Sequence, residues 1–299
     1  MLDPNELYEL AGELPELDRP VLVVAMTGFV DAAGATRIAA DHLRAHGDPV
    51  DVATFDVDQL YDYRARRPAM LFVEDHWEGY EEPQIRVEAL TDTVGSRFLM
   101  LAGPEPDVQW ERFVAAVRQL CERLDVRASV GFNSIPMAVP HTRALGVTAH
   151  ASRRELIAEY QPWLQRVQVP ASAAHLLEFR LGRAGRDAMG FSVHVPHYLA
   201  QTDYPAAAQT MLEAVSRATG LSLVGESLRV AAEAVRADVD GQVERSEEVS
   251  SVVRALEEQY DAYVAGRGPD LLDGQSGPLP TADELGAELE RFLAEQTDD

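Results

Sequence analysis

The amino-acid sequence predicts a three-layer α/β/α protein, with helices on both faces of a mixed and mostly parallel sheet, and a helical extension at its C-terminal end. Three observations predict this class. Runs of β-branched residues such as PVLVVAM, residues 20–26, are typical of strands buried on both faces. These runs alternate with segments of helical spacing, as in strands joined by helical crossovers. After about residue 222 only the helical spacing continues.

The strand over residues 20–26 leads into a turn that carries three candidate binding residues, Gly28, Asp31 and Gly34. Helical spacing begins at residue 35, so the unit is predicted to be strand, turn and helix. Free N–H groups at the start of such a helix can bind an anion, whereas an Asp31 N-cap would fill the same donors. We favour the cap, because G-x-x-D-x-x-G is weak evidence for a ligand and differs from the dinucleotide-binding motif G-x-G-x-x-G.

The next segment predicts an edge of the sheet. Residues 50–57 alternate as a strand does, and residues 69–73 and 84–89 are expected to be shorter, antiparallel strands on either side of a turn-rich stretch. Before them, the arginines of residues 60–68 form a basic cluster in an acidic protein. Such a cluster can bind an anion or an acidic partner, but we favour a solvated loop paired with nearby carboxylates.

A further strand and helix are predicted after this edge. Residues 97–102, RFLMLA, have the composition of a buried strand, and Asp107 is expected to cap a helix with an apolar stripe from Trp110 to Leu124. Cys121 lies on that stripe. We therefore interpret it as a small core residue and not as a nucleophile.

The stretch GFNSIPMAVPHTRALGVTAHAS, residues 131–152, concentrates polar side chains after a strand over residues 126–132. We expect a buried strand that leads into a loop whose path is fixed by Pro136 and Pro140. This loop displays the tripeptide His141, Thr142 and Arg143.

The alternation of strands and helices continues to about residue 220. The residues 152–155 match a capping box for a short helix, residues 166–169 are expected to form a short strand, and Ser172 is expected to cap the next helix. Residues 188–196 then predict a strand, and residues 205–219 a helix with a proline in its first turn.

The domain organisation follows from the change in composition after this helix. Residues 1–222 are predicted to form the α/β/α domain. Residues 223–265 carry apolar residues every three or four positions, with Gly241 between two runs, which predicts a helical hairpin or one long helix. A linker rich in Gly, Pro and Asp over residues 266–280 leads to a last amphipathic helix, residues 281–299.

The net charge limits the partners of this protein. Its 50 acidic and 26 basic residues give a formal charge of −24, so we expect neither a nucleic acid nor a membrane partner. The acidic N-terminal segment lacks the features of a signal peptide, and a single cysteine cannot form an intrachain disulfide. We therefore expect a cytoplasmic protein.

The chain contains no lysine, so every basic side chain other than histidine is an arginine. This absence excludes P-loop nucleotide binding, Schiff-base catalysis and protein kinase chemistry, each of which requires a lysine. A G-x-S-x-G nucleophile motif is also absent from the sequence. The sequence therefore contains no recognisable catalytic set, and we expect no cofactor.

Three loops at the predicted ends of strands carry the candidate site residues. Ligands of open α/β sheets bind outside the carboxyl ends of strands, so convergence of these loops would build a pocket. Arg143 would bind an anion, His141 or His197 would transfer a proton, and Asp31 would act as a base or orient another group. Each residue also has a structural interpretation; His194, for example, is equally well explained as a hydrogen-bonded core residue. The histidine spacing matches no zinc motif, so no metal is expected. The candidate residues are Gly28, Asp31, Gly34, Pro136, His141, Thr142, Arg143, His194, His197 and Tyr198.

Four segments together resemble the family named for the second proteasome assembly chaperone, in its actinobacterial branch. They are PVLVVAMTGFVDAAG, VATFDVDQLYDYRARRP, SIPMAVPHTRALGVTAHAS and MGFSVHVPHYLAQTDYP, of which IPMAVPHTR is the most specific part. The resemblance covers about residues 18–265. It implies a phosphorylase/hydrolase-like α/β/α fold with a helical C-terminal addition, and assembly into homo-oligomers such as trimers.

Two departures from the family pattern bear on function. Ala144 stands where a proline usually follows His-Thr-Arg, and residues 296–299 lack the hydrophobic-Tyr-X tail with which such chaperones dock on proteasomes. Proteasome subunits remain a partner that the resemblance implies, but without that docking route. Two hypotheses follow. The first is a non-enzymatic, oligomeric protein-interaction module; the second is a small-molecule-binding protein or a hydrolase/phosphorylase-like enzyme that holds an anion through Arg143.

Overall fold

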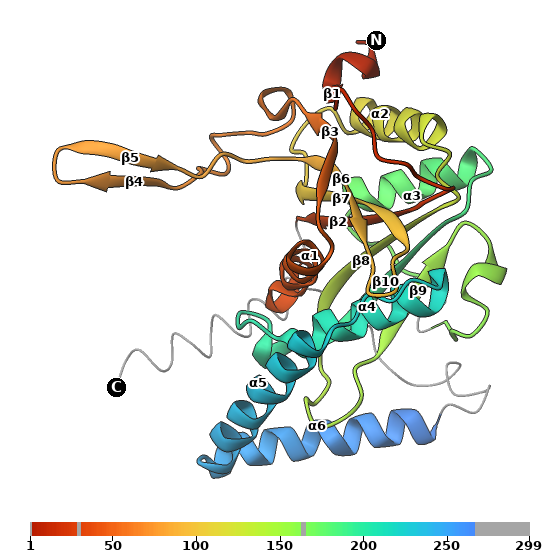
Figure 1. The fold of residues 1–299 in the computed structure, drawn as a ribbon. Helices are drawn as coiled ribbons and strands as arrows, with labels where there is room; N and C mark the ends of the chain where they lie inside the picture. Colours follow the sequence, from red (N-terminus) through yellow and green to blue (C-terminus); the bar gives the residue numbers. More distant parts are fainter. Residues whose placement is uncertain (1, 29–30, 163–165, 267–299) are drawn as a thin grey trace. The chain divides into compact units, whose positions relative to one another are not determined.

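The computed structural model describes residues 2–28, 31–162 and 166–266 (Figure 1). Its contacts divide the chain into two units, Met1–Glu257 and Glu258–Asp299, and the sheet with its covering helices belongs to the first. Of the predicted C-terminal linker and last helix, residues 267–299 lie outside the described residues.

The first unit is built on an eight-stranded mixed sheet. Its strands are β1 (Tyr8–Leu10), β2 (Val21–Thr27), β3 (Val50–Phe55), β6 (Arg86–Thr91), β7 (Arg97–Pro104), β8 (Ala128–Met137), β9 (Val147–Ala151) and β10 (Ala188–Pro196). Their order is β1-β3-β6-β7-β2-β8-β10-β9. The central strands β7, β2, β8 and β10 run parallel to one another, and antiparallel pairs complete the sheet at both edges.

Helices cover both faces of this sheet (Figure 1). On one face lie α1 (Ala35–His46) and α4 (Pro205–Thr219), and on the other lie α2 (Trp110–Arg123) and α3 (Ala173–Arg183). Each face has its own hydrophobic core, as expected when a sheet is buried on both sides. The arrangement confirms the predicted three-layer α/β class. Short 3-10 turns lie at Pro4–Leu7, Ala32–Gly34, Val57–Gln59, Arg154–Ile157 and His197–Leu199.

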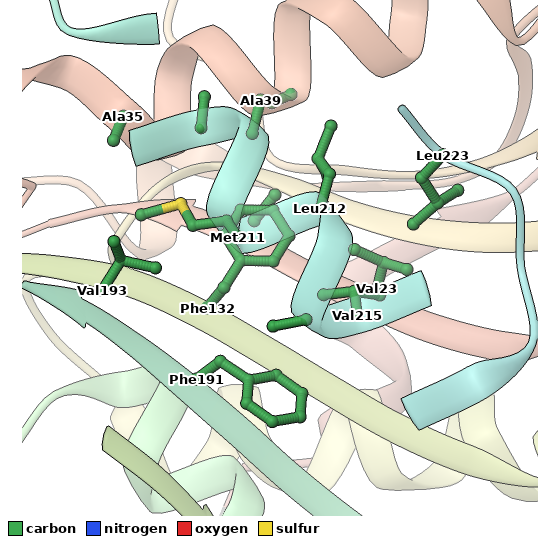
Figure 2. Close-up of a cluster of buried hydrophobic side chains, with 14 of the residues drawn as sticks. Val23, Ala35, Ala39, Phe132, Phe191, Val193, Met211, Leu212, Val215 and Leu223 are labelled. Atoms are coloured by element: carbon green, nitrogen blue, oxygen red, sulfur yellow. The ribbon is translucent and has the colours of Figure 1, made fainter. Parts of the chain in front are cut away.

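The core beneath α1 and α4 is formed by alternate residues of the central strands. Figure 2 shows Phe191 and Val193 of β10 and Phe132 of β8 gathered with Met211 of α4. The side chains of Phe191, Val193 and Met211 are 0% exposed. Because strand side chains alternate between faces, the residues between these belong to the opposite face of the sheet.

Two further strands, β4 (Met70–Val73) and β5 (His76–Tyr80), form a separate two-stranded sheet that extends away from the main one (Figure 1). The first agrees with the short strand predicted over residues 69–73. The second lies in a stretch predicted to be rich in turns, so that prediction was wrong. Its acidic residues and Gly79 indicate a turn by composition, but they belong to a hairpin whose residues are mostly exposed and so show no pattern of buried positions.

Two predicted caps illustrate how long-range contacts compete with local ones. Ser172 does cap α3, accepting a hydrogen bond from the backbone N–H of His175 at 3.1 Å. Asp107 does not cap α2; its carboxylate instead accepts from the backbone N–H of Asp62 and pairs with Arg66, both at 2.7 Å. The prediction of an Asp107 cap was wrong because a distant loop supplies stronger partners for the same oxygens.

The segment that follows the His-Thr-Arg loop also differs from expectation. Residues 147–151 were included in the loop but form the edge strand β9, antiparallel to β10. Ser152 does not form a capping box, because its hydroxyl accepts from the backbone N–H of Ala188 at 3.1 Å. The strand predicted over residues 166–169 is absent from the structure, in which these residues are irregular and Val167 and Val169 are exposed.

The helical extension consists of α5 (Glu226–Glu244) and α6 (Glu247–Ala265). The segment predicted to be a helical hairpin or one long helix is thus two helices, with the break after Glu244 and not at Gly241. Helix α6 crosses the division between the two units at Glu257. Across the described ranges, no helix is both long enough and apolar enough to traverse a lipid bilayer.

We expect Phe191→Ala to lower the free energy of unfolding by about 3–5 kcal/mol, because it leaves a cavity in a closely packed core. Urea titration followed by circular dichroism measures the change. Phe179, 54% exposed on α3, offers a matched control, for which the same substitution should change stability by about 0.5 kcal/mol or less. Equal effects at the two positions would contradict the core position of Phe191.

Candidate functional site

The turn between β2 and α1 is held together by Asp31. One carboxylate oxygen of Asp31 accepts hydrogen bonds from the backbone N–H of Thr36 at 2.7 Å and the hydroxyl of Ser134 at 3.3 Å. Its other oxygen accepts from the backbone N–H of Arg37 at 3.4 Å. Asp31 therefore occupies donors at the start of α1 that an anion would need, although the N-cap position of α1 belongs to Gly34 and not to Asp31. Gly34 of the same turn adopts a left-handed conformation, φ +57°, which favours glycine.

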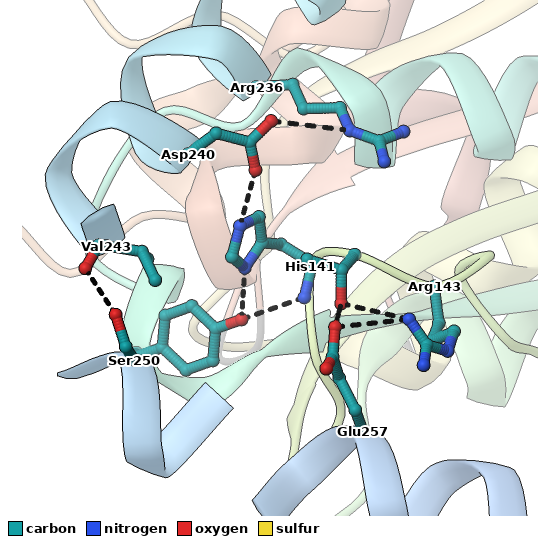
Figure 3. A network of polar contacts seen from close by, with 9 residues as sticks. His141, Arg143, Arg236, Asp240, Val243, Ser250 and Glu257 are labelled. Atoms are coloured by element: carbon teal, nitrogen blue, oxygen red, sulfur yellow. Dashed lines mark hydrogen bonds and ion pairs between the residues drawn. The ribbon is translucent and has the colours of Figure 1, made fainter. Parts of the chain in front are cut away.

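His141 is buried at the centre of a polar network that joins the His-Thr-Arg loop to α5 (Figure 3). Its backbone N–H donates to the Tyr198 hydroxyl at 2.8 Å, and its Nδ1 lies 2.6 Å from the same oxygen. Its Nε2 lies 3.0 Å from Asp240 of α5. Since Asp240 as a carboxylate can only accept, Nε2 carries the proton and Nδ1 accepts from the tyrosine. Burial raises the pKa of Tyr198 to about 12, so its hydroxyl keeps the proton that it donates.

The next two residues of the loop bind α6 (Figure 3). The Thr142 hydroxyl donates to Glu257 at 2.5 Å, and the Arg143 guanidinium pairs with the same carboxylate oxygen at 3.1 Å. Both are charge-assisted hydrogen bonds, among the stronger polar contacts of a protein. The tripeptide thus binds both helices of the extension, through acidic residues that lie about a hundred positions further along the chain.

The three loops that carry the predicted site residues do converge. The turn is tied to the loop after β10 through Ala33, whose N–H donates to the Ala200 carbonyl at 2.6 Å and whose carbonyl accepts from Tyr204 at 3.2 Å. The bond between His141 and Tyr198 joins the remaining loop to the same segment. The polar groups of the three loops therefore form hydrogen bonds and ion pairs with other residues of the same chain.

The remaining predicted site residues lie in or beside the sheet. Pro136 pairs with Val195 in the parallel register of β8 and β10. His194 is buried in β10, with its Nε2 2.8 Å from the Thr148 hydroxyl of β9. The exposed ring of His197 packs edge-on against Tyr198, with ring centroids 5.5 Å apart. No group of three or more His, Cys, Asp or Glu side chains in the described ranges is arranged to hold a metal ion.

A histidine of α1 also holds the start of α5. The His42 Nε2 accepts a hydrogen bond from the backbone N–H of Gly225, the residue that caps α5, at 3.2 Å. Burial, assisted by the neighbouring His46, lowers the pKa of His42 below its ordinary value of 6.5. The neutral form is the one that can accept this bond, so the contact depends on His42 remaining unprotonated.

The hairpin of β4 and β5 exposes large apolar side chains on both of its strands. The sequence analysis did not predict this exposed apolar surface. Phe72 and Trp77 are paired in register, with ring centroids 4.9 Å apart and side chains 53% and 62% exposed. Met70, Leu71 and Tyr80 beside them are between 49% and 55% exposed. The available signal was the run Met-Leu-Phe-Val followed within a few residues by two aromatic residues, an apolar composition on both strand faces.

Comparison with protein families gives one match. The model of the PAC2 family matches residues 25–243, which run from the end of β2 through the later strands of the sheet to most of α5. Among curated proteins, none matches this chain significantly.

Solved structures include two similar proteins from actinobacteria. A Mycobacterium tuberculosis protein of unknown function is 50% identical, with a TM-score of 0.85 over 87% of this chain and 92% of that one. A Corynebacterium glutamicum protein of unknown function is 36% identical, with a TM-score of 0.83 over 86% of this chain and 98% of that one. A proteasome-assembly chaperone homologue of Mycobacterium tuberculosis has the same fold, with 24% identity and a TM-score of 0.71 over 78% and 99% of the two chains.

We expect Tyr198→Phe to lower the free energy of unfolding by about 1–3 kcal/mol, because it leaves the buried N–H of His141 without its acceptor. Hydrogen exchange of the α5 amides should become faster in the same variant, since Asp240 is held through His141. Tyr8→Phe is the matched control: the Tyr8 hydroxyl makes only a 3.4 Å bond to Asn5 at the surface, so its loss should change neither measurement appreciably. An unaltered rate of hydrogen exchange in α5 would show that the His141 network does not hold this helix.

We expect acid to weaken the folded state through His42. Its pKa is lower in the folded than in the unfolded chain, so the unfolded chain binds the proton first and stability falls as pH drops below about 6.5. One such group contributes at most about 1.4 kcal/mol per pH unit. Unfolding titrations between pH 8 and pH 5 should therefore show a shallower acid slope for His42→Gln, which retains an acceptor, than for the wild-type protein. An unchanged slope in His42→Gln would exclude this role.

Proposed function

The chain belongs to the PAC2 family, and on that basis we propose that it is a non-enzymatic protein-interaction module that assembles with copies of itself and acts in the manner of a proteasome assembly chaperone. Its single cysteine is free and buried, which suits a reducing compartment, and we place this activity in the cytoplasm. The observation that carries the proposal is the exposed apolar hairpin.

The hairpin needs a partner on physical grounds. A two-stranded sheet by itself is marginally stable in water, and its outer edges present unpaired backbone groups. Here Phe72 and Trp77 add two large aromatic side chains, both more than half exposed. Aromatic residues on an exposed apolar patch are typical of the centre of a protein interface, where their burial contributes most of the binding free energy.

A second copy of this chain is the partner that the charges favour. Glu74, Asp75 and Glu78 make the tip of the hairpin acidic, whereas exposed Arg64 and Arg67 precede its base. Two hairpins in antiparallel contact would bring the acidic tip of each against the arginines of the other while covering both aromatic pairs. Such self-complementary contact is the geometry of a two-fold interface. Opposite charges at its rim would orient the encounter.

The proposed link to the proteasome rests on the relative described as a proteasome-assembly chaperone homologue. The alternative in which Arg143 binds a small anion is less favoured, since its guanidinium pairs with Glu257 and thereby joins the loop to α6. The family signature in this loop then serves to hold the helical extension, and the exposed surfaces are left to bind other proteins.

We expect the double variant Phe72→Ser and Trp77→Ser to abolish self-association, because it removes the apolar centre of the interface. Sedimentation velocity should give an oligomer for the wild-type protein and a 32.8 kDa monomer for the variant at the same concentration. Phe179→Ser changes an equally exposed aromatic residue on α3 and should leave the oligomer intact. A monomeric wild-type protein, or an oligomer unaffected by the double variant, would refute the hairpin interface.

The proteasome link requires a separate measurement. The tagged protein should retain proteasome subunits when it is isolated from its own cells and analysed by mass spectrometry. Recovery without any proteasome subunit, from cells in which the protein forms its oligomer, would refute the chaperone-like role and leave self-association standing.

A further inference from the structure

The face of the sheet covered by α3 carries polar and glycine residues where a doubly covered strand normally has apolar ones. On β10, Gly190, Ser192 and His194 alternate with the apolar residues of the opposite core. On β8 the equivalent positions are Ser129, Gly131 and Asn133, and the Ser192 hydroxyl donates to the Asn133 side chain at 2.6 Å. A strand face of this composition cannot contribute to a hydrophobic core, so it must have another use.

A cavity of about 70 Å³ lies at this face. Its walls come from β2, β8, β9, β10 and α3, from the segment before α3 and from the residues that follow β2 and β7. A single buried water needs about 10–15 Å³ of cavity volume, so the cavity has room for roughly five to seven water-sized groups. That is enough for a small polar head group.

One wall of the cavity is a pair formed by an imidazole and a carboxylate. The Nδ1 of His150 on β9 lies 2.8 Å and 3.0 Å from the two carboxylate oxygens of Glu178 on α3. The ring of His175 meets that of His150 edge-on, with centroids 5.3 Å apart. Burial lowers the pKa of His175, so this second imidazole is neutral near pH 7 and adds no positive charge.

The lining also includes a second carboxylate, Glu105, in the segment after β7. One of its oxygens accepts from the backbone N–H of Ala173 at the start of α3, at 2.5 Å. The other oxygen lies over Gly28, close enough that a Cβ on Gly28 would come within 2.6 Å of it. Glu105 and Glu178 thus line one cavity from two different elements.

Glycines keep the cavity open at two points. A Cβ on Gly190 would lie 2.3 Å from Cε1 of His150 and 3.0 Å from a carboxylate oxygen of Glu178, so any larger residue would displace both groups. A residue larger than glycine at position 28 would likewise displace the side chain of Glu105. Glycine is thus required at both positions because side chains approach the backbone closely there.

The charge of the lining selects the ligand. Two carboxylates line the cavity, and the described residues around it include no arginine, while the whole chain lacks lysine. Carboxylates partly removed from water are stabilised by a cation that donates hydrogen bonds to them. A planar guanidinium or an ammonium group supplies both the charge and the donors.

We propose that this cavity binds a cationic nitrogen group, a guanidinium or primary ammonium, between Glu178 and Glu105. Asn133 and the His150 ring complete its polar surroundings, and the apolar residues Met26 and Leu177 contact the alkyl chain that carries it. The site is independent of the hairpin and holds whether or not the protein self-associates. The group can come from a free small amine or from a basic side chain of a protein partner.

The test compares two ligands of almost equal shape on the full chain. Nα-acetyl-arginine amide should bind in isothermal titration calorimetry, whereas Nα-acetyl-citrulline amide, its neutral counterpart, should bind at least about tenfold more weakly. Glu178→Gln and Glu105→Gln should each weaken arginine amide binding by at least about tenfold, because each removes charge but keeps the acceptor oxygen. Glu13→Gln removes the same charge at an exposed position outside the cavity lining and should leave binding unchanged.

Two further arms identify the source of the group and guard against misfolding. Agmatine binding as tightly as an Ala-Arg-Ala peptide would indicate a free amine, whereas clearly tighter binding of the peptide would indicate a partner's side chain. Thermal unfolding of each variant checks that it is folded. Gly190→Ala keeps both carboxylates but displaces His150 and Glu178, so it should also reduce binding. Equal binding of citrulline and arginine amides, unchanged binding in both carboxylate variants, or no binding of any cationic ligand would overturn the proposal.

Discussion

The four central strands of the sheet are buried on both faces, and the rest of the structure is arranged to satisfy that burial. Strands of this kind are parallel here, so each connection must return across a face, which places α1 on one side and α2 and α3 on the other. Helix α4 follows the last strand and packs beside α1. Polar loops are thereby confined to the ends of the strands. For this reason the predicted site residues lie together at the ends of the strands.

At those strand ends, the polar groups satisfy one another within the chain. Asp31 holds the start of α1, His141 is bonded to Tyr198 and Asp240, and Glu257 accepts from the loop's threonine and arginine. A buried polar network is stable only when its members are paired, and this one is paired through the helical extension. The density of His, Thr and Arg in the loop therefore has a structural use, which is to hold α5 and Glu257 of α6.

Two parts of the structure do not follow the rule of two-sided apolar burial, and both point to binding. The hairpin of β4 and β5 lies apart from the main sheet and exposes apolar residues that a second protein would cover. Opposite α3, polar and glycine residues replace the core and leave a cavity flanked by Glu105 and Glu178. The first suits a protein surface, whereas the second suits a small cationic group.

The sequence by itself determined the α/β class, the buried strands, the Ser172 cap and the family, because hydrophobic periodicity, local capping and motif segments are all readable along the chain. Only the tertiary structure decided which polar residues meet. His141 and Asp240 are separated by 99 positions, and His150 and Glu178 lie on elements whose contact depends on strand order. The tertiary structure also decided that Asp107 bonds Asp62 and Arg66 and that β5 pairs with β4 as a strand. Neither feature is specified by the residues next to it in the sequence. Periodicity fixes which face of an element is buried, but the neighbour that it meets there is set by how the whole sheet is assembled.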